Sequence, residues 1–168
     1  MASMERKNAV LADKFYCDNT LAAEDVSITL PAVTFLTSEV QAMGTMDVVL
    51  AGIIEAMEMT ITKIGLDTGL SRMLTPTKHN YEARWAQNVL KSDGSVAPEG
   101  CKAFVTGIPK GIPGIGIELA ANSESEIAIA VSRFQLYIGG AEACCIDRIG
   151  GVCRINGVDY YSRISSLL

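Results

Sequence analysis

SEIAIAVSRFQLYIGG, residues 125–140, holds the longest strongly alternating run in the chain. Ile127, Ile129 and Val131 fall on one face of an extended backbone, and the residues between them are small or polar, which is typical of a strand buried on one side. From Phe134 onward the apolar residues continue in the opposite phase, so we expect a twist or a bulge at the Ser-Arg pair before it. A Gly-Gly pair then ends the strand in a turn. The stretch predicts a long central strand around which the other strands are organised.

Other alternating runs predict further strands. Met57, Met59 and Ile61 alternate with glutamate and threonine, and the run that begins at His79 alternates up to an Asp-Gly pair, a strong hairpin signal. The β-branched run at 25–36 is interrupted by a proline and predicts two short strands. Strands are expected in addition at 55–63, 79–90, 101–108 and 115–120.

One short helix is expected beside these strands. At residues 68–75, Asp67 or Thr68 can cap the first backbone N–H groups of a helix that ends before Pro76. A chain of 168 residues can bury about 70% of its unfolded surface as one domain. The predicted fold is mainly β, an antiparallel β-sandwich or barrel with one short flanking α-helix.

The sequence divides into three parts. Residues 1–24 have mixed polarity and are expected to form an extended N-terminal arm with little core of its own. Residues 25–155 form the β-domain, and the segment 37–47 should project from it as a loop or hairpin tip, because alternation is lost there and Gly44 offers a turn. Residues 156–168 form an amphipathic C-terminal tail.

Charge and hydropathy exclude several classes of function. The formal net charge is −5 and no cluster of lysine and arginine is present, which argues against a general grip on nucleic acid. No uncharged run approaches the ~20 apolar residues of a membrane span, so we expect no membrane insertion by the monomer. The N-terminal residues lack the apolar run of a secretion signal, so synthesis and assembly are expected in the host cytoplasm.

Few residues suggest catalysis or metal binding. The five cysteines have no paired metal spacing and are expected to be free thiols that serve as small apolar core residues. His79, the only histidine, has no partner nearby in the sequence and is expected at the surface or at a strand start. The triplet Asp67-Thr68-Gly69 matches the catalytic triplet of dimeric aspartic proteases, but a helix cap is the simpler role for Asp67. We expect no catalytic residue, metal or cofactor.

Five segments, in order along the chain, carry a resemblance to a known family: ITLP at 28–31, residues 39–47, GIIEAME at 52–58, residues 133–140 and INGVD at 155–159. Together they resemble the major tail tube protein family, which forms the inner tube of contractile phage tails and of R-type bacteriocins. The resemblance runs from about residue 26 to the C-terminus.

This resemblance implies a structural subunit that forms hexameric rings stacked into a hollow tube. Sheets of neighbouring subunits would join around the bore and remove exposed strand edges. The implied partners are further copies of the chain, an outer contractile sheath, a tape-measure protein and a baseplate. DNA, or ions in a bacteriocin, would pass through the lumen without specific binding. The mature location would be a virion tail or a released tail-like particle.

The polar phases of the two best strands are the candidates for the lumen wall. An acidic wall of small residues would let DNA slide, because phosphate finds no cationic partner there. An ordinary solvated sheet face accounts for the same pattern. The lumen candidates are Glu58, Thr60, Thr62, Glu126, Ala128, Ala130 and Ser132.

Contacts between subunits and rings are expected at the projecting segment, the arm and the tail. Head-to-tail contacts between different patches of one chain propagate into filaments. The candidate contact residues are Val40, Met43, Gly44, Met46, Asp47, Asn156, Gly157 and Asp159.

Two other functions stay open at this point. The Asp-Thr-Gly triplet allows a small dimeric aspartic protease, and the strand-rich pattern allows a generic β-barrel ligand-binding module. Replacement of Asp67 by Asn should abolish a protease but leave tube assembly largely intact.

Overall fold

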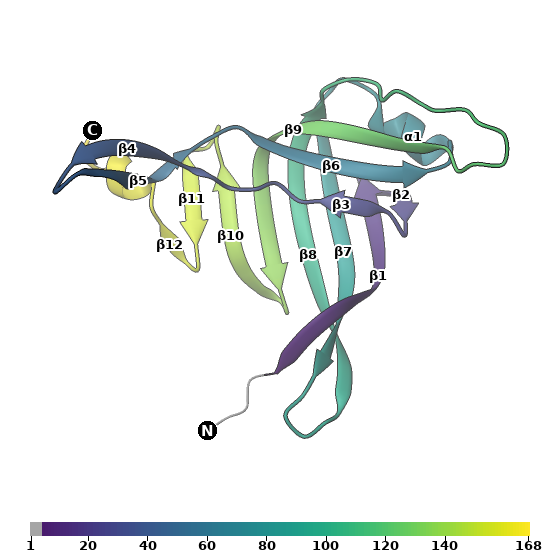
Figure 1. Ribbon diagram of the computed structural model, residues 1–168, viewed down its shortest axis with the longest axis horizontal. Helices are drawn as coiled ribbons and strands as arrows, with labels where there is room; N and C mark the ends of the chain where they lie inside the picture. Colours follow the sequence, from purple (N-terminus) through teal and green to yellow (C-terminus); the bar gives the residue numbers. More distant parts are fainter. Residues whose placement is uncertain (1–4) are drawn as a thin grey trace.

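The central strand of the fold is β9 (Glu124–Ile138), as its alternation predicts. The computed structural model describes residues 5–168 and is mostly antiparallel β-structure, which confirms the predicted mainly-β class (Figure 1). The other strands are β1 (Arg6–Cys17), β2 (Thr20–Glu24), β3 (Ser27–Thr29), β4 (Phe35–Gln41), β5 (Thr45–Ile54), β6 (Met57–Ile64), β7 (His79–Leu90), β8 (Val96–Pro109), β10 (Ala141–Asp147), β11 (Val152–Ile155) and β12 (Val158–Asp159). The helices are α1 (Thr68–Met73) and α2 (Ser162–Ser165), and neither is long enough to cross a membrane.

Ten strands form one sheet that branches at β9. The main path runs β12-β11-β10-β9-β8-β7-β1-β2, and β6 pairs with both β9 and β3. One edge of β9 pairs with β8, whereas its other edge pairs first with β6 and then with β10. The hairpin of β4 and β5 is a separate two-stranded sheet. β9 is therefore the one strand that holds both branches together.

The predicted break in β9 is a β-bulge at Ser132. Arg133 lies opposite Thr106 of β8, but the next residue of β8, Gly107, lies opposite Val131. The extra residue shifts the alternation, so that Val131 and Phe134 are both buried. The change of phase that the sequence shows is thus confirmed.

The core lies between two layers of this bent sheet. In Figure 1, β3, β6 and the first half of β9 cross in front of β7 and β8. Met59 and Ile61 of β6 and Ile129 of β9 are fully buried and belong to the same apolar cluster as Ala103 of β8 and Tyr81 of β7. The apolar phases of both predicted strands therefore face the subunit core.

Helix α1 closes one end of this core. The Asp67 side chain accepts a hydrogen bond from the backbone N–H of Leu70 at 3.0 Å, which confirms the predicted N-cap. Leu70 and Met73 are buried. Gly69 lies against β2, where an added Cβ would come within 1.9 Å of the Ala22 carbonyl oxygen. This close approach explains why the second residue after the cap is a glycine.

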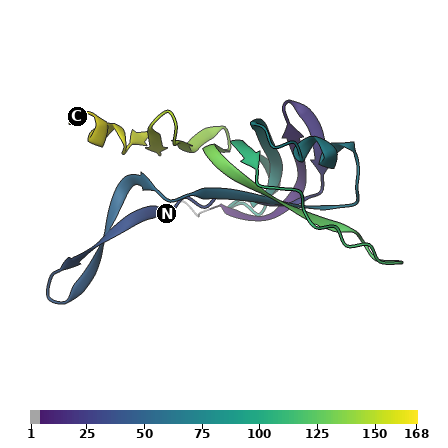
Figure 2. The ribbon, with the colours of Figure 1, turned by 90° about the horizontal axis from the view of Figure 1, so that it is seen from above.

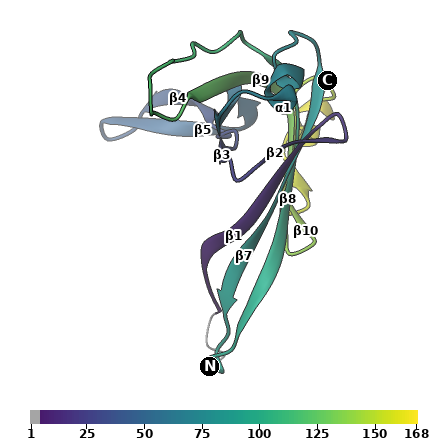
Figure 3. The same cartoon turned by 90° about the vertical axis from the view of Figure 1, so that its right-hand side faces the viewer.

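Two expectations about the fold are wrong. Residues 115–120 form no strand but belong to an irregular loop between β8 and β9, where apolar Ile117 and Leu119 are almost fully exposed. The N-terminal region, within its described residues, forms β1 and β2 of the main sheet, and Phe15 and Cys17 of β1 are core residues. Only the first half of β1 is exposed, beside the long β7–β8 hairpin (Figure 3).

Four of the five cysteines are buried, as expected for small apolar core residues, and Cys144 is half-buried.

Candidate assembly surfaces and a polar cluster

The predicted lumen residues of β6 and β9 lie together on one face of the sheet. Antiparallel pairing places Glu58 opposite Ala130, and two steps along it places Thr60 opposite Ala128. Thr62 lies opposite Glu126 in the same way. Residues directly opposite each other share a face, so six of the seven candidates form one patch that points away from the buried core. Ser132, at the bulge, donates a hydrogen bond to the Thr106 carbonyl at 3.2 Å.

Small and acidic side chains make up this patch, which we call the polar face. Strand β3 extends it, because Ser27 and Thr29 lie opposite Thr62 and Thr60. Glu58 forms an ion pair with Lys110 at the start of the β8–β9 loop. Glu126 is exposed, and among the described residues it has no salt-bridge partner. The net character of the polar face is therefore acidic, with one compensated carboxylate.

The segment 37–47 lies within the β4–β5 hairpin, which stands out from the body (Figure 2). Val40 pairs with Met46 and Glu39 with Asp47 across the hairpin. Met43 and Gly44 form the tip with positive φ angles of 53° and 116°. The Met43 side chain is fully exposed. Apolar side chains at the end of a projecting hairpin are an unusual surface for a monomer in water.

The second group of predicted contact residues lies at the β11–β12 turn. Asn156 and Gly157 form this turn with φ angles of 49° and 81°. Asp159 is occupied within the tail, because its Oδ1 accepts hydrogen bonds from the backbone N–H groups of Tyr161 at 3.0 Å and Ser162 at 3.2 Å. Its carboxylate therefore orders the entry to α2.

The two groups of contact residues lie at the same end of the molecule, although the hairpin tip points away from the tail (Figures 1 and 2). Gly52 of β5 packs on the backbone of Tyr160 and Tyr161, where an added Cβ would lie 3.2 Å from the Tyr160 carbonyl oxygen. The base of the hairpin is thus fixed to the C-terminal tail.

Asp67, the candidate protease residue, has a structural role. Besides capping α1, its carboxylate contacts the Lys63 ammonium at 2.6 Å. Lys63 is buried on the core side of β6 and also donates a hydrogen bond to the Ala22 carbonyl at 3.1 Å. The hydrogen bond from Lys63, followed by that from the Leu70 N–H, holds the pKa of Asp67 below its usual range. A carboxylate held ionised by a lysine is unlike a pair of aspartates that share a proton.

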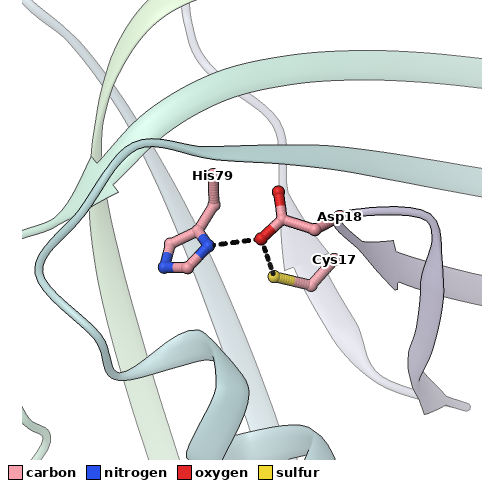
Figure 4. Close-up of side chains that lie close together, drawn as sticks. All are labelled: Cys17, Asp18 and His79. Carbon is pink, nitrogen blue, oxygen red and sulfur yellow. Dashed lines mark hydrogen bonds and ion pairs between the residues drawn. The ribbon is translucent and has the colours of Figure 1, made fainter.

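A polar cluster that the sequence did not predict joins the β1–β2 turn to the start of β7 (Figure 4). His79 Nδ1 lies 2.7 Å from Asp18 Oδ2, and Cys17 Sγ lies 3.9 Å from the same oxygen. His79 starts a strand, as expected, but it is not at the surface: it is buried against Asp18, 61 residues away. Nothing in the local sequence marks a pair so far apart.

Burial and hydrogen bonds set the ionisation of this cluster in opposite directions. The backbone N–H of Asn80 and the side chain of His79 hold the pKa of Asp18 below its usual range. Burial raises the pKa of the Cys17 thiol to about 11. The cluster thus contains an ionised carboxylate beside a protonated thiol.

Comparisons with known proteins agree with the fold and with the family resemblance of the sequence. No significant match is found among curated proteins. Among solved structures, a chain in the cryo-EM structure of an extracellular contractile injection system, a PVC sheath-tube complex in the extended state, is similar with a TM-score of 0.52 and 12% identity. The alignment covers 75% of this chain and 88% of that one, and at this identity it shows a shared fold.

The family model described as phage tail tube protein FII matches residues 9–168. This match covers nearly the whole sequence, including both polar strands, the projecting hairpin and the C-terminal tail. The protein belongs to the phage tail tube protein FII family.

Proposed function

We propose that this tail tube subunit, a structural protein and not an enzyme, assembles into hexameric rings that stack into a hollow tube lined by its polar face. The single observation that carries the lumen assignment is the register of β6 and β9, which gathers Glu58, Thr60, Thr62, Glu126, Ala128 and Ala130 on the side away from the core. One side of this sheet is buried against the core of the subunit, so only the other side can line a bore.

The polar face suits passage without binding. The alanine and threonine side chains carry no positive charge that would bind phosphate, and the carboxylate of Glu126 repels it. DNA would therefore slide through the tube of a phage tail, and ions would pass through that of a bacteriocin. Assembly would take place in the host cytoplasm on a baseplate, around a tape-measure protein, and a contractile sheath would surround the finished tube.

Stacking between rings would use the β4–β5 hairpin. Val40, Met43 and Met46 expose apolar surface at its outer part, and association with the next ring would remove that surface from water. The exposed first half of β1 and the tail from Asn156 would complete the contacts with adjacent subunits. In this arrangement the tail of residues 156–168 flanks a tube domain that includes β1 and β2.

Negative-stain electron microscopy of the purified full-length protein at several concentrations tests assembly. Hollow rings or tubes of uniform width are the expected result. Dispersed particles at every concentration, also after addition of a baseplate as initiator, would contradict the proposal.

Gold labelling of a cysteine introduced by Ala128→Cys tests the lumen assignment. Metal particles should appear along the tube axis in electron micrographs of labelled tubes. Unchanged protein reports the background from Cys144, the one native cysteine that is not buried. A Ser95→Cys variant, which carries its thiol on the β7–β8 turn, provides a label away from the polar face. Labels from Ala128→Cys on the outer wall would exclude this face from the lumen.

A further inference from the structure

Cys17, Asp18 and His79 form a cluster whose chemistry the tube function does not use. One ligand atom of each, the thiol Sγ, a carboxylate oxygen and a ring nitrogen, lies within 4.8 Å of the other two. Cys17 and His79 are buried, whereas Asp18 is exposed to solvent. Figure 4 shows a ring nitrogen of His79 and the sulfur of Cys17 turned toward the same carboxylate oxygen of Asp18. The arrangement therefore has an inner side of protein and an outer side open to water.

The hydrogen bond that His79 makes on the side away from the cluster determines which ring nitrogen carries a proton. His79 Nε2 lies 2.9 Å from the Thr75 carbonyl oxygen, which can only accept, so Nε2 carries a proton. In the neutral ring Nδ1 then presents a lone pair to Asp18 Oδ2 at 2.7 Å, and two acceptors face each other. A positive charge must lie between them, either a proton or a metal ion.

The surroundings of the cluster match those of a metal site. A histidine that binds a metal commonly donates its other N–H to a backbone carbonyl, as His79 does to Thr75. The backbone N–H of Asn80 binds Asp18 Oδ1 at 2.9 Å, which leaves Oδ2 turned toward His79 and Cys17. Both contacts orient the ligand atoms before any ion arrives.

The tyrosine next to the cluster, Tyr81, gives a second, independent observation. Tyr81 is 1% exposed, and among the described residues its hydroxyl has no hydrogen-bond partner. Tyr81 lies directly opposite Cys17 in the β1–β7 pairing, and its ring centroid lies 5.8 Å from that of His79. An orphaned polar atom at such a place is accounted for by a bound water or ion.

We propose that Cys17 Sγ, Asp18 Oδ2 and His79 Nδ1 bind a Zn²⁺-type ion, with water from the exposed side as the fourth ligand. Sulfur, nitrogen and carboxylate oxygen are the donor set of zinc, whereas Mg²⁺ and Ca²⁺ select oxygen alone. On binding, the Cys17 S–H bond breaks, the proton passes to water, and a sulfur–metal bond forms. Ligand distances of about 2.0–2.3 Å require His79 and Asp18 to part by roughly half an ångström. The ion would join the β1–β2 turn to β7 and to the end of α1.

Cobalt(II) titration of the untagged full-length protein tests this site directly. Co²⁺ replaces zinc in such sites, and a thiolate ligand should give a near-ultraviolet charge-transfer band together with visible bands that saturate at one ion per chain. Zn²⁺ added afterwards should displace the cobalt and remove the bands. A titration without any band would overturn the proposal.

Ligand variants with a matched control assign the bands. Cys17→Ser should abolish the charge-transfer band, and Asp18→Asn, at an exposed position where the amide oxygen can still accept from Asn80, should weaken Co²⁺ binding by about 10–100-fold or more. Cys101→Ser removes another buried thiol and should leave the spectrum unchanged. Equal spectra for Asp18→Asn and the unchanged protein would contradict the assignment.

His79 is the only histidine of the chain, so NMR of its ring can tell whether a metal ion or a proton lies between Nδ1 and Asp18. In a ¹⁵N NMR spectrum the two ring nitrogens of His79 give signals that no other residue can produce. Zn²⁺ should shift the Nδ1 signal and leave a proton on Nε2. If both nitrogens stay protonated at saturating Zn²⁺, an imidazolium ion pair with Asp18 occupies the position and the metal proposal fails.

Discussion

Lys63 is a charged residue at a buried position. It lies in the core phase of β6 together with Met59 and Ile61, and its ammonium reaches Asp67 and the Ala22 carbonyl. A buried cation is tolerated only when paired and hydrogen-bonded. The Asp-Thr-Gly triplet is therefore explained by the lysine four residues before it and by the helix that follows.

Asp67→Asn should lower the free energy of unfolding by about 1–3 kcal/mol. The loss of a partner from a fully buried pair costs about 3–5 kcal/mol, and the half-exposed side chain of Asp67 reduces this value. Asparagine still caps a helix, so the variant removes the charge and keeps the cap. Urea unfolding at neutral pH measures the change.

Lys63→Met is the matched control for this pair. Methionine fills a similar volume without a charge, so the variant should lose less stability than Asp67→Asn, and the double variant should resemble Lys63→Met alone. Additive losses in the double variant would show that the two side chains do not interact.

The stabilising effect of Asp67 should depend on pH in one direction. Because Lys63 lowers the pKa of Asp67 in the folded chain, the unfolded chain binds this proton more readily. The contribution is therefore complete above about pH 4, the unfolded pKa, and is lost as the pH falls through the folded value. The difference in unfolding free energy between the unchanged protein and Asp67→Asn should stay constant from about pH 5 to 7 and shrink below pH 4. A constant difference down to acid pH would contradict this origin.

At the scale of single elements, β9 shows how far periodicity predicts structure. Its alternation gives the strand, its buried residues and even the bulge, because each depends on the side of the backbone to which a side chain points. The alternation does not predict which strands pair with β9, because one of them, β6, lies far away in the sequence. The strand predicted at 115–120 is absent because the alternating apolar residues at 115 and 117 have no neighbouring strand to pair with.

Gly107→Ala should weaken the β8–β9 pairing beside the bulge. An added Cβ would lie 2.5 Å from the Ala130 carbonyl oxygen, so the strands must separate, at a cost of about 1–3 kcal/mol. Gly100→Ala is the control on the same strand, because its Cβ would meet no atom within 4 Å. Thermal unfolding compares the two, and equal melting temperatures would show that the bulge tolerates the extra atom.

The β4–β5 hairpin should matter for assembly and not for folding. Met46→Asp changes an exposed residue, so the stability of the subunit should move by no more than about 0.5 kcal/mol, whereas ring stacking should be lost because a charge would be buried in the contact. Met46→Leu keeps the apolar surface and should still form tubes. Sedimentation together with electron microscopy gives the readout, and tubes of normal length from Met46→Asp would remove the hairpin from the stacking contact.

For the whole molecule, the sequence predicted the class of fold and the faces of its strands, but not how distant parts meet. The mixed polarity of residues 1–24 predicts an arm, because nothing in the local sequence shows that pairing with β7 brings Phe15 and Cys17 into the core. His79 and Asp18 are another example, since their contact depends on where the β1–β2 turn falls against β7. The family resemblance supplied the tube assignment, which no single residue could carry.

Reversal of charge on the polar face should make tubes retain DNA. Glu126→Lys places a cation where phosphate would pass, and multiplied around a ring it should give binding that weakens as salt rises. Glu118→Lys makes the same change in the loop before β9, outside the paired residues of β6 and β9. Co-sedimentation of short DNA with preformed tubes at low and high salt compares them. Equal retention by both variants would argue against a lumen position for Glu126.

The branched pairing of β9 also determines when the chain is most vulnerable. Met57 pairs with Val131, and the strand that contains it leaves the ribosome long before β9 has been synthesised. At about 5–20 residues per second, the edge of β6 that pairs with β9 stays open for several seconds. Wrong pairing between nascent chains is thus a hazard of translation, and a chaperone that covers β6 during those seconds would protect the supply of tube subunits.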